Sequence, residues 1–364
     1  MTTTLLGGAH LARAAGGLPV PTALDRRTWD LDGGALERGT ARGLLERARA
    51  DVGTPWPATT ARTWARYHRD GDRLEHEGLV AARQQRLTRA CVAAALTLDP
   101  ALVDEVTDGV LLLCEQSSWC WPAHDDARST PGRTGAGSVL PRADAPHLDL
   151  GAGEVAGQLA WADHLLGPLL DERCPGLRER VRWEVRQRVL RPFTERRDWH
   201  WLGLDGDVHN WNPWIHGNVV AAALALVDDD DERRELCALA LEGLDRYVAA
   251  LPDDGAVDEG FAYWWNGACR ALEALDLLDA ATDGATGWTG VPALCATTAF
   301  PRAMHLGGPW HVNVADGSAL APDDLPWDAL PDLYVETLTG ATTFRYDPAD
   351  AFVDVDPRFY AARY

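Results

Sequence analysis

Three segments of the sequence combine tryptophan, histidine and neutral hydrogen-bonding side chains beside the ends of helical runs. They are residues 114–128, 198–218 and 252–272. Aromatic rings mixed with neutral donors and acceptors suit a polar ligand such as a sugar. A single segment of this kind is explained by helix caps and packed tryptophans, but three in one chain predict a sugar-binding cleft. Its candidate residues are Trp119, His124, His209, Asn210, Trp211, Glu259, Tyr263, Trp264 and Arg270.

Helices must position these side chains, because apolar residues recur with helical spacing from residue 35 to about residue 300. Short Gly, Pro and Asp punctuation separates many of the helices, as in αα-hairpins. This pattern fits a bundle, a solenoid or a closed toroid of paired helices, and no fixed-period repeat supports the solenoid. The expected helices are residues 35–52, 83–98, 102–116, 154–172, 177–196, 218–227, 232–251, 266–282 and 292–306.

Outside the helical region the pattern changes. We expect an N-terminal extension over residues 1–34, one helical domain over residues 35–306, and a short irregular C-terminal extension over residues 307–364. Within the domain, residues 129–145 are rich in Gly, Pro, Arg and Asp and predict a long loop, of a length that is usually functional or mobile.

The composition and net charge exclude or disfavour several classes of chemistry and binding partner. The 364 residues carry a net charge of −21, and all 34 basic residues are arginine, so lysine-dependent chemistry is excluded. An acidic body disfavours nucleic acid and anionic membranes, and a polyanionic sugar would need a local pocket of arginine, histidine or neutral donors. No apolar run is long enough to cross a bilayer. The first residues make a poor signal peptide, so we expect a cytoplasmic protein.

Neither a metal nor a cofactor is expected. The seven cysteines form no CxxC pair, and His209 and His216 lack a third ligand at metal-binding spacing. No phosphate loop or dinucleotide fingerprint is present. The run of aspartates at residues 228–231 followed by Glu232 predicts a solvated turn rather than the magnesium site of an isoprenoid synthase.

Two motifs carry a family resemblance. HNWNPWIHGN at residues 209–218 precedes DGAVDEGFAYWWNGACRALEALDLL at residues 254–278. Weaker support comes from WCWPAH, HLDLGAGEVAGQLAWADHLL and NVADGSA, so that the resemblance covers roughly residues 100–320. In these motifs the chain resembles the helical half of the heparinase II/III-like polysaccharide lyases. The resemblance implies an all-α fold, an α/α toroid made of antiparallel helix hairpins as an incomplete barrel, and β-elimination on a uronic-acid-containing polysaccharide.

The resemblance also implies roles for the residues in these motifs. His209 or Asn210 would neutralise the substrate carboxylate, and the order of the two residues leaves open which one does so. Tyr263 would act as base, acid or both, with His209 as its partner. A tyrosine base needs a lowered pKa, which a nearby cation such as Arg270 would provide. The residues expected to contact the substrate are Trp119, His124, Trp211, Glu259, Trp264 and Arg270.

Members of this family also contain a β-sandwich that is expected to supply a further catalytic histidine. The resemblance therefore implies a missing β-sandwich domain or a partner chain, unless His305 or His311 takes that role. The expected ligand is an acidic polysaccharide or oligosaccharide.

Two other functions remain open at this stage. A glycoside hydrolase on the same architecture would need two carboxylates across a cleft, with candidates Asp149, Asp207, Asp258 and Glu259. A non-catalytic carbohydrate-binding or scaffold domain would use the 16 tryptophans as a stacking surface.

Overall fold

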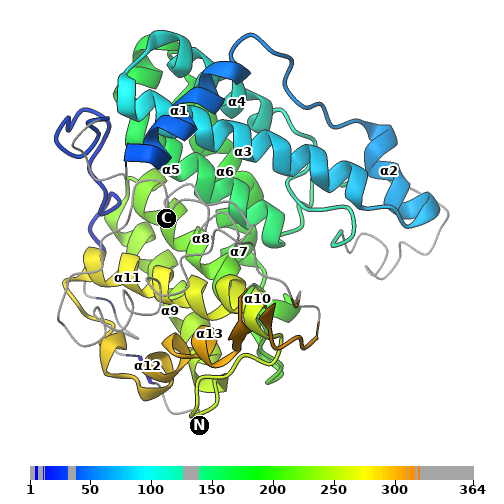
Figure 1. Ribbon diagram of the computed structural model, residues 1–364, viewed down its shortest axis with the longest axis vertical. Coiled ribbons are helices and arrows are strands. Elements are labelled where there is room, and N and C mark those ends of the chain that lie inside the picture. The colour runs from blue at the N-terminus through cyan, green and yellow to red at the C-terminus, as the bar shows by residue number, and fades with distance from the viewer. Residues whose placement is uncertain are drawn as a thin grey trace. The chain divides into compact units, whose positions relative to one another are not determined.

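The computed structural model describes residues 5–6, 11, 13–31, 38–125, 139–308, 310–315 and 319. The described residues are mostly helical, as the sequence predicts, and their one sheet is a two-stranded hairpin (Figure 1). The chain divides into two compact units: unit 1 comprises Met1–Val20 and Arg197–Tyr364, and unit 2 comprises Pro21–Arg196. The predicted domain limits at residues 34 and 306 stay predictions, and most of residues 307–364 lies outside the described part.

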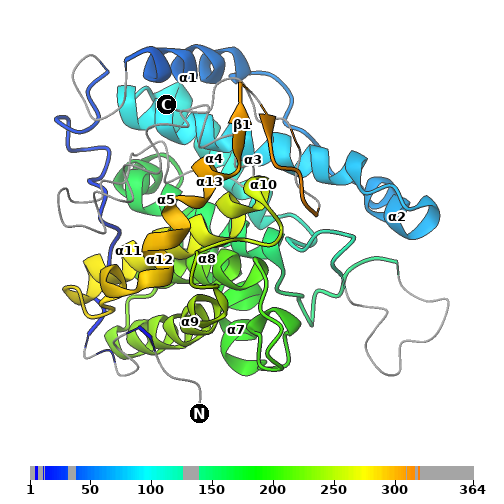
Figure 2. The same cartoon turned by 60° about the horizontal axis from the view of Figure 1, so that its bottom comes forward.

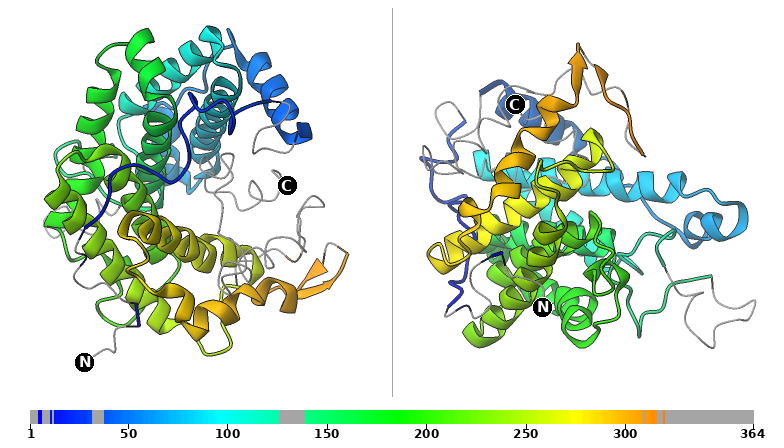
Figure 3. Two further views of the ribbon diagram at one scale, coloured as in Figure 1. Left: turned by 90° about the vertical axis from the view of Figure 1, so that its left-hand side faces the viewer. Right: turned by 90° about the horizontal axis from the view of Figure 1, so that it is seen from below.

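Unit 2 consists of helices. Consecutive helices α3, α4, α5 and α6 pack on one another, and the views of Figure 3 show α3, α4 and α5 side by side. Residues of α5 are buried on every side from Leu150 to Leu166 except His164, so this helix is the centre of the unit. The elements are α1 (Arg38–Asp51), α2 (Ala61–Asp70), α3 (Leu74–Thr97), α4 (Pro100–Cys114), α5 (Leu150–Arg173), α6 (Leu177–Val185), the π-helix η2 (Arg186–Leu190) and α7 (Arg191–Glu195).

The turn between α3 and α4 follows from local residue chemistry. Leu98 ends α3 in the left-handed region, with φ of 54°. Asp99 then caps α4 by accepting the backbone N–H of Ala101, and Pro100 occupies the first turn, where its missing N–H costs nothing. These residues reverse the chain within a few positions and pack the two helices as a hairpin.

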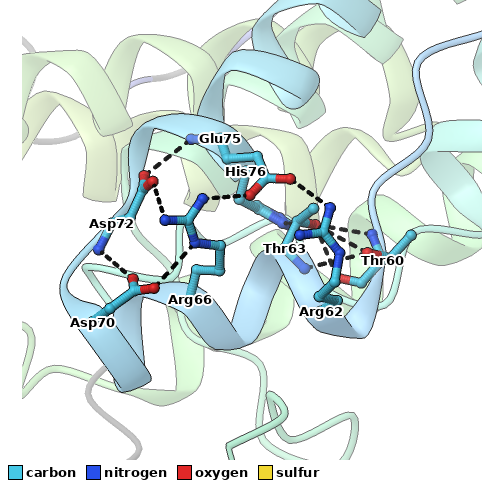
Figure 4. A network of polar contacts seen from close by, with 8 residues as sticks. All are labelled: Thr60, Arg62, Thr63, Arg66, Asp70, Asp72, Glu75 and His76. Atoms are coloured by element: carbon cyan, nitrogen blue, oxygen red, sulfur yellow. Dashed lines mark hydrogen bonds and ion pairs between the residues drawn. The ribbon is translucent and has the colours of Figure 1, made fainter.

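Helix α2 was not expected from the sequence, because charged residues interrupt its apolar pattern. A capping box begins it, in which Thr60 and Thr63 each accept the other's backbone N–H. Figure 4 shows Arg66 at the centre of the carboxylates that follow, with Nη1 2.7 Å from Glu75 and Nη2 2.8 Å from Asp72. Polar contacts therefore hold this turn where apolar burial is small.

His76 ties the same turn to the interior of unit 2. Its Nδ1 atom lies 3.0 Å from the Thr63 hydroxyl, and its ring meets Trp64 edge to face. Burial, reinforced by the charge of Arg83, lowers the pKa of His76 to about 4. The imidazole is consequently neutral at physiological pH and acts as a packed hydrogen-bonding group.

Arg86 anchors the α1–α2 connection to α3. Its Nε donates to Glu105 at 2.6 Å, and its other nitrogens donate to the carbonyl groups of Asp51, Thr54 and Pro55. The guanidinium also lies 4.1 Å from the centroid of the Trp56 ring. Both charged side chains are almost fully buried, at 5% and 6% exposed. One guanidinium thus satisfies a carboxylate and a whole loop of carbonyl groups.

Unit 1 is built around α8, α9 and α11, which pack against each other; Figure 2 shows α8 and α9 side by side. None of the described helices in either unit is long and apolar enough to cross a membrane. The elements of unit 1 are the 3-10 helix η3 (His200–Leu202), α8 (Trp211–Leu226), α9 (Asp230–Ala250), α10 (Phe261–Trp264), the π-helix η4 (Trp265–Cys269), α11 (Arg270–Thr282), the 3-10 helix η5 (Trp288–Gly290), α12 (Pro292–Thr298), α13 (Phe300–Ala303), and the antiparallel strands β1 (His305–Gly307) and β2 (Trp310–His311).

Part of the predicted N-terminal extension belongs to the packing of unit 1. The backbone N–H groups of Ala15 and Gly17 donate to carbonyls near the C-terminal ends of α11 and α8, at 2.8 and 2.7 Å. The buried Arg233 donates to the carbonyl of Ala14 at 2.8 Å. The extended segment therefore supplies partners for carbonyl groups that helix ends leave unsatisfied.

Replacing Arg86 tests whether this buried network stabilises unit 2. Arg86→Met removes the donor while the Glu105 carboxylate and three loop carbonyls stay buried, so we expect a loss of about 3 to 5 kcal/mol in the free energy of unfolding. Arg89→Met is the control, since Arg89 makes a partly exposed pair with Asp51 and should cost about 1 kcal/mol or less. Urea denaturation measures both, and equal losses would contradict this account.

Candidate functional site

The candidate residues divide between the two units. Trp119 and His124 belong to unit 2, and all the others belong to unit 1. Each group is therefore described by itself.

In unit 1, the start of α8 gathers three aromatic side chains. The ring of His209 stacks on that of His200, with centroids 5.4 Å apart. Trp211 contacts both rings, at 5.0 Å from His200 and 5.9 Å from His209. His200 is exposed and His209 is half-buried. Two imidazoles thus stand beside an indole at an accessible helix start, an arrangement able to exchange protons and contact a sugar ring. His200 was not among the predicted site residues.

Asn210 lies where α8 approaches the π-helix η4. It is buried, and its side chain makes no capping hydrogen bond. A Cβ atom added to Gly267 would lie 3.5 Å from the Cβ of Asn210 and 2.8 Å from the hydroxyl oxygen of Tyr247. A larger residue than glycine at position 267 would require Tyr247 to shift. Three elements, α8, α9 and η4, therefore converge at Gly267, and π-helical turns of this kind are frequent at functional sites.

Two further asparagines in the same elements have unmet hydrogen-bonding capacity. Asn212 in α8 is fully buried, and neither its amide oxygen nor its amide nitrogen has a partner among the described residues. Asn266 in η4, next to Gly267, is buried with its amide oxygen likewise unpartnered there. An unmade hydrogen bond of this kind costs about 1 to 3 kcal/mol. Such exceptions are uncommon and point to a site where polar groups matter.

His216 is a structural residue. Its Nδ1 atom lies 2.6 Å from the carbonyl oxygen of Asn212, and its ring rests against the backbone of α9, where any side chain on Gly243 would collide with it. Burial lowers the pKa of His216 to about 3. The imidazole is therefore neutral at physiological pH and serves to pack α8 on α9.

Tyr263 lies on α10, one turn before Gly267 in a continuous helical segment, and is half-buried. Arg270 follows Gly267 by three residues. Its guanidinium lies 5.8 Å from the ring centroid of Trp214 and 3.3 Å from Glu273. Whether Arg270 lowers the pKa of Tyr263 stays a prediction.

Trp264 is a core residue. It is 0% exposed, and its indole N–H donates to the carbonyl oxygen of Thr297 at 2.9 Å. This packing leaves no ring face for a sugar. Glu259 is half-exposed in the turn before α10. With Asp258 it lies close enough for its charge to raise the pKa of Tyr247.

Tyr247 is a further residue of the candidate site that the sequence did not single out. It is buried on α9 with its hydroxyl directed at Gly267. Burial, and after it the charges of Glu259 and Asp258, raises the pKa of Tyr247 above its ordinary value. Tyr247 is thus a neutral phenol, suited to hydrogen bonding rather than to proton abstraction.

In unit 2, Asp149 holds the predicted residue His124. One Asp149 oxygen accepts from the Trp121 N–H at 3.0 Å and lies 2.9 Å from His124 Nδ1, and the other caps α5 through Ala152. The Nε2 atom of His124 lies 3.4 Å from the Arg73 guanidinium. Asp149 is 0% exposed. Its carboxylate is occupied by these contacts, which makes it an orienting group rather than the acid of a hydrolase.

Trp119 is nearly buried, donates its indole N–H to the Leu113 carbonyl at 2.8 Å, and stacks under Arg188. It also borders a pocket of about 270 Å³ that lies wholly within unit 2. The pocket is lined by Ser117, Ser118, Trp119, Arg142, Ala143, Pro146, His147, Ala152, Arg180, Trp183, Glu184, Gln187 and Arg188.

Comparison with known proteins adds no identification. No model of a known protein family matches the sequence, and no curated protein matches it significantly. The resemblance to the heparinase II/III-like lyases therefore stays a prediction. In the part of the chain that the structure describes, no three histidine, cysteine or acidic side chains gather as a group able to hold a metal ion.

The close approach at Gly267 can be tested by a double-mutant cycle. Gly267→Ala places a methyl group against the Tyr247 hydroxyl, so we expect a loss of about 1 to 3 kcal/mol in the free energy of unfolding. Tyr247→Phe removes that oxygen, and the double variant should recover part of the loss. Thermal or urea unfolding of the four proteins measures the coupling. Strictly additive effects would show that the two residues do not touch.

Asp276 on α11 has a raised pKa, which makes the stability of the protein depend on pH. Burial, and after it the charges of Asp279 and Glu273, raises the pKa of Asp276 to about 7. The folded protein therefore binds a proton between the ordinary carboxyl pKa of about 4 and this value, where the unfolded chain has released it. Stability falls as the pH rises through this window, and the full loss is present above about pH 7.

Asp276→Asn should therefore stabilise the protein at about pH 8 by roughly 2 to 4 kcal/mol and much less at about pH 4. Urea denaturation at both pH values measures this difference. Glu235→Gln removes an exposed carboxylate from α9 and serves as the control. A stabilisation by Asp276→Asn that is equal at both pH values would refute the raised pKa.

Proposed function

We propose that this chain is the helical part of a polysaccharide lyase that acts by β-elimination on a uronic-acid-containing polysaccharide. The observation that carries the proposal is the convergence at Gly267. Asn210, a neutral amide donor, lies against the helix turn that follows Tyr263, the proposed proton-transfer residue. An amide and a phenol on adjoining helices are the two groups that elimination requires.

The reaction follows from these groups. An amide or imidazole donor, Asn210 or His209, neutralises the substrate carboxylate and so makes the adjacent C5 proton more acidic. The tyrosinate form of Tyr263 removes that proton. The electron pair forms the C4–C5 double bond, the C4–O glycosidic bond breaks, and the leaving oxygen takes a proton from Tyr263 or His209. No water is consumed.

Several features support this assignment of roles. His209 and His200 stack at an accessible helix start, where an imidazole can exchange protons with substrate and solvent. Arg270 follows Tyr263 by seven residues in the same helical segment, and the proposal assigns to its positive charge the stabilisation of the phenolate. Tyr247 remains protonated, so its hydroxyl can donate a hydrogen bond.

The same proposal includes the α/α toroid. Its support is the pairing of successive helices inside each unit: α3 with α4, α4 with α5 and α5 with α6 in unit 2, and α8 with α9 in unit 1. Short connections join α3 to α4, α5 to α6 and α8 to α9, and these three pairs suit the hairpins of a toroid, whereas residues 115–149 separate α4 from α5.

A non-catalytic carbohydrate-binding domain is the second candidate. The observation in its favour is the arginine-rich pocket of unit 2, which could hold an acidic sugar without any chemistry. The hydrolase alternative is weaker. Of its four candidates, Asp149 is occupied as a helix cap and Asp207 and Asp258 are exposed, which leaves the half-exposed Glu259 without a second candidate carboxylate.

The proposal is tested by ultraviolet absorbance of the conjugated double bond on a panel of polygalacturonate, alginate and glycosaminoglycans. We expect a rise with the parent protein that falls by about 10²- to 10⁴-fold in Tyr263→Phe, because the acid–base group is lost. Tyr67→Phe, the same change at an exposed position on α2, is the matched control and should keep full activity.

Two outcomes would sink the proposal. New reducing ends without absorbance would indicate hydrolysis, and full activity in Tyr263→Phe would place the chemistry elsewhere. Sugar binding without any product would favour the carbohydrate-binding candidate.

A further inference from the structure

The pocket of unit 2 concentrates positive charge in a chain of net charge −21. Three arginines line it, namely Arg142, Arg180 and Arg188, and Glu184 is the one carboxylate in the lining. Two carboxylates outside the lining, Asp144 and Glu115, pair with Arg142 and Arg180. Because an acidic protein repels anions at long range, a basic pocket of this kind is where an anion would be bound. The volume of about 270 Å³ is at the small end for a ligand site, suited to one sugar ring or a little more.

Glu184 orients two of these arginines, Arg180 and Arg188. Its side chain is 2% exposed, and its oxygens accept from Arg180 Nε at 2.7 Å and Arg188 Nε at 2.6 Å. The remaining nitrogens of Arg188 donate to the carbonyl oxygens of Gln116 and Cys114. Arg188 is therefore a fixed wall of the pocket, while Arg180 is held only along one edge.

Donors remain available at the mouth. Arg142 binds Asp144 through Nε and Nη2, and Arg180 binds Glu184 and Glu115 through the same pair of nitrogens. Within the described residues the Nη1 groups of Arg142 and Arg180 have no hydrogen-bond partner. Ser117, Ser118 and Gln187, whose side chains carry hydroxyl and amide donors, are also among the lining residues. Guanidinium and hydroxyl donors together match a carboxylate beside sugar hydroxyls.

Trp183 provides an apolar face at the same mouth. It lies on α6 between the turns that carry Arg180 and Gln187, and it is 57% exposed, the most exposed of the described tryptophans. An exposed tryptophan contributes little to the packing of the fold. It gains apolar contact when the ring of a ligand covers it.

We propose that this pocket binds a carboxylate-bearing sugar ring, one residue of an acidic oligosaccharide. Arg142 and Arg180 hold the carboxylate, the serines and Gln187 contact hydroxyl groups, and Trp183 stacks on the ring. The basic pocket alone specifies an anion, and the choice of a sugar among anions rests on the proposed function. The site itself consists only of unit 2 residues and needs none of the catalytic candidates of unit 1.

Isothermal titration calorimetry of the full chain with a galacturonate trisaccharide tests the proposal. We expect Arg142→Gln and Trp183→Ala each to weaken binding by about tenfold or more, because each removes a principal contact. Arg173→Gln is the matched control for charge, since the Arg173 and Asp104 pair has the same two-nitrogen geometry and the side chain is 40% exposed against 42% for Arg142. Trp310→Ala, at 53% exposed, is the control for Trp183.

Neutral and non-sugar ligands complete the experiment. Maltotriose should bind at least tenfold more weakly than the acidic trisaccharide, and a simple dicarboxylate should bind weakly and without dependence on Trp183. The proposal is overturned if the acidic trisaccharide does not bind, if the pocket variants bind like their controls, or if maltotriose or the dicarboxylate binds equally well.

The failure of this proposal is distinguishable from failure of the proposed function. Tyr263→Phe should slow formation of the ultraviolet product by about 10²- to 10⁴-fold and leave trisaccharide binding at the pocket unchanged. Binding that depends on Arg142, in a protein that makes no unsaturated product, supports the pocket and removes the lyase. If an unsaturated product forms but binding does not depend on Arg142 and Trp183, the lyase function is supported and the pocket proposal is overturned.

Discussion

The Tyr247 hydroxyl lies 2.8 Å from the place that a Cβ on Gly267 would occupy, so the missing side chain of Gly267 lets α9 approach η4 this closely. A second glycine, Gly243, lets the ring of His216 rest on α9. Interiors are packed too tightly to absorb an added methyl group without cost. The position of Asn210 beside the Tyr263 helix, on which the proposed chemistry depends, follows from these two contacts.

Arginine fills the structural roles that other proteins divide between arginine and lysine. The planar guanidinium offers five donors in a fixed geometry, so one side chain can satisfy several carbonyl groups together. Arg86 does this for the loop after α1, and Arg233 does it for the carbonyl of Ala14 in the N-terminal segment together with that of Val227 after α8. Both are nearly buried. In the pocket of unit 2 the same property leaves some donors committed to the fold and others facing outward.

The sequence predicts the helices well where apolar residues recur regularly, as in α5 and α9. It fails for α2, where the network around Arg66 replaces an apolar face. It also predicts a continuous helix over residues 177–196, which the structure divides at the π-helix η2, because a single wide turn leaves no mark in apolar spacing.

The candidate site shows the same limit. The aromatic motifs identify the start of α8 and the α10 region, but Tyr247 depends on how α9 meets η4. The burial of Trp264 depends on a hydrogen bond to Thr297, 33 residues away.

Mass spectrometry of products from a defined oligouronate tests the central claim, β-elimination, most directly. Elimination predicts fragments whose masses sum to that of the parent, with one fragment unsaturated. Fragments that together carry one added water would contradict it.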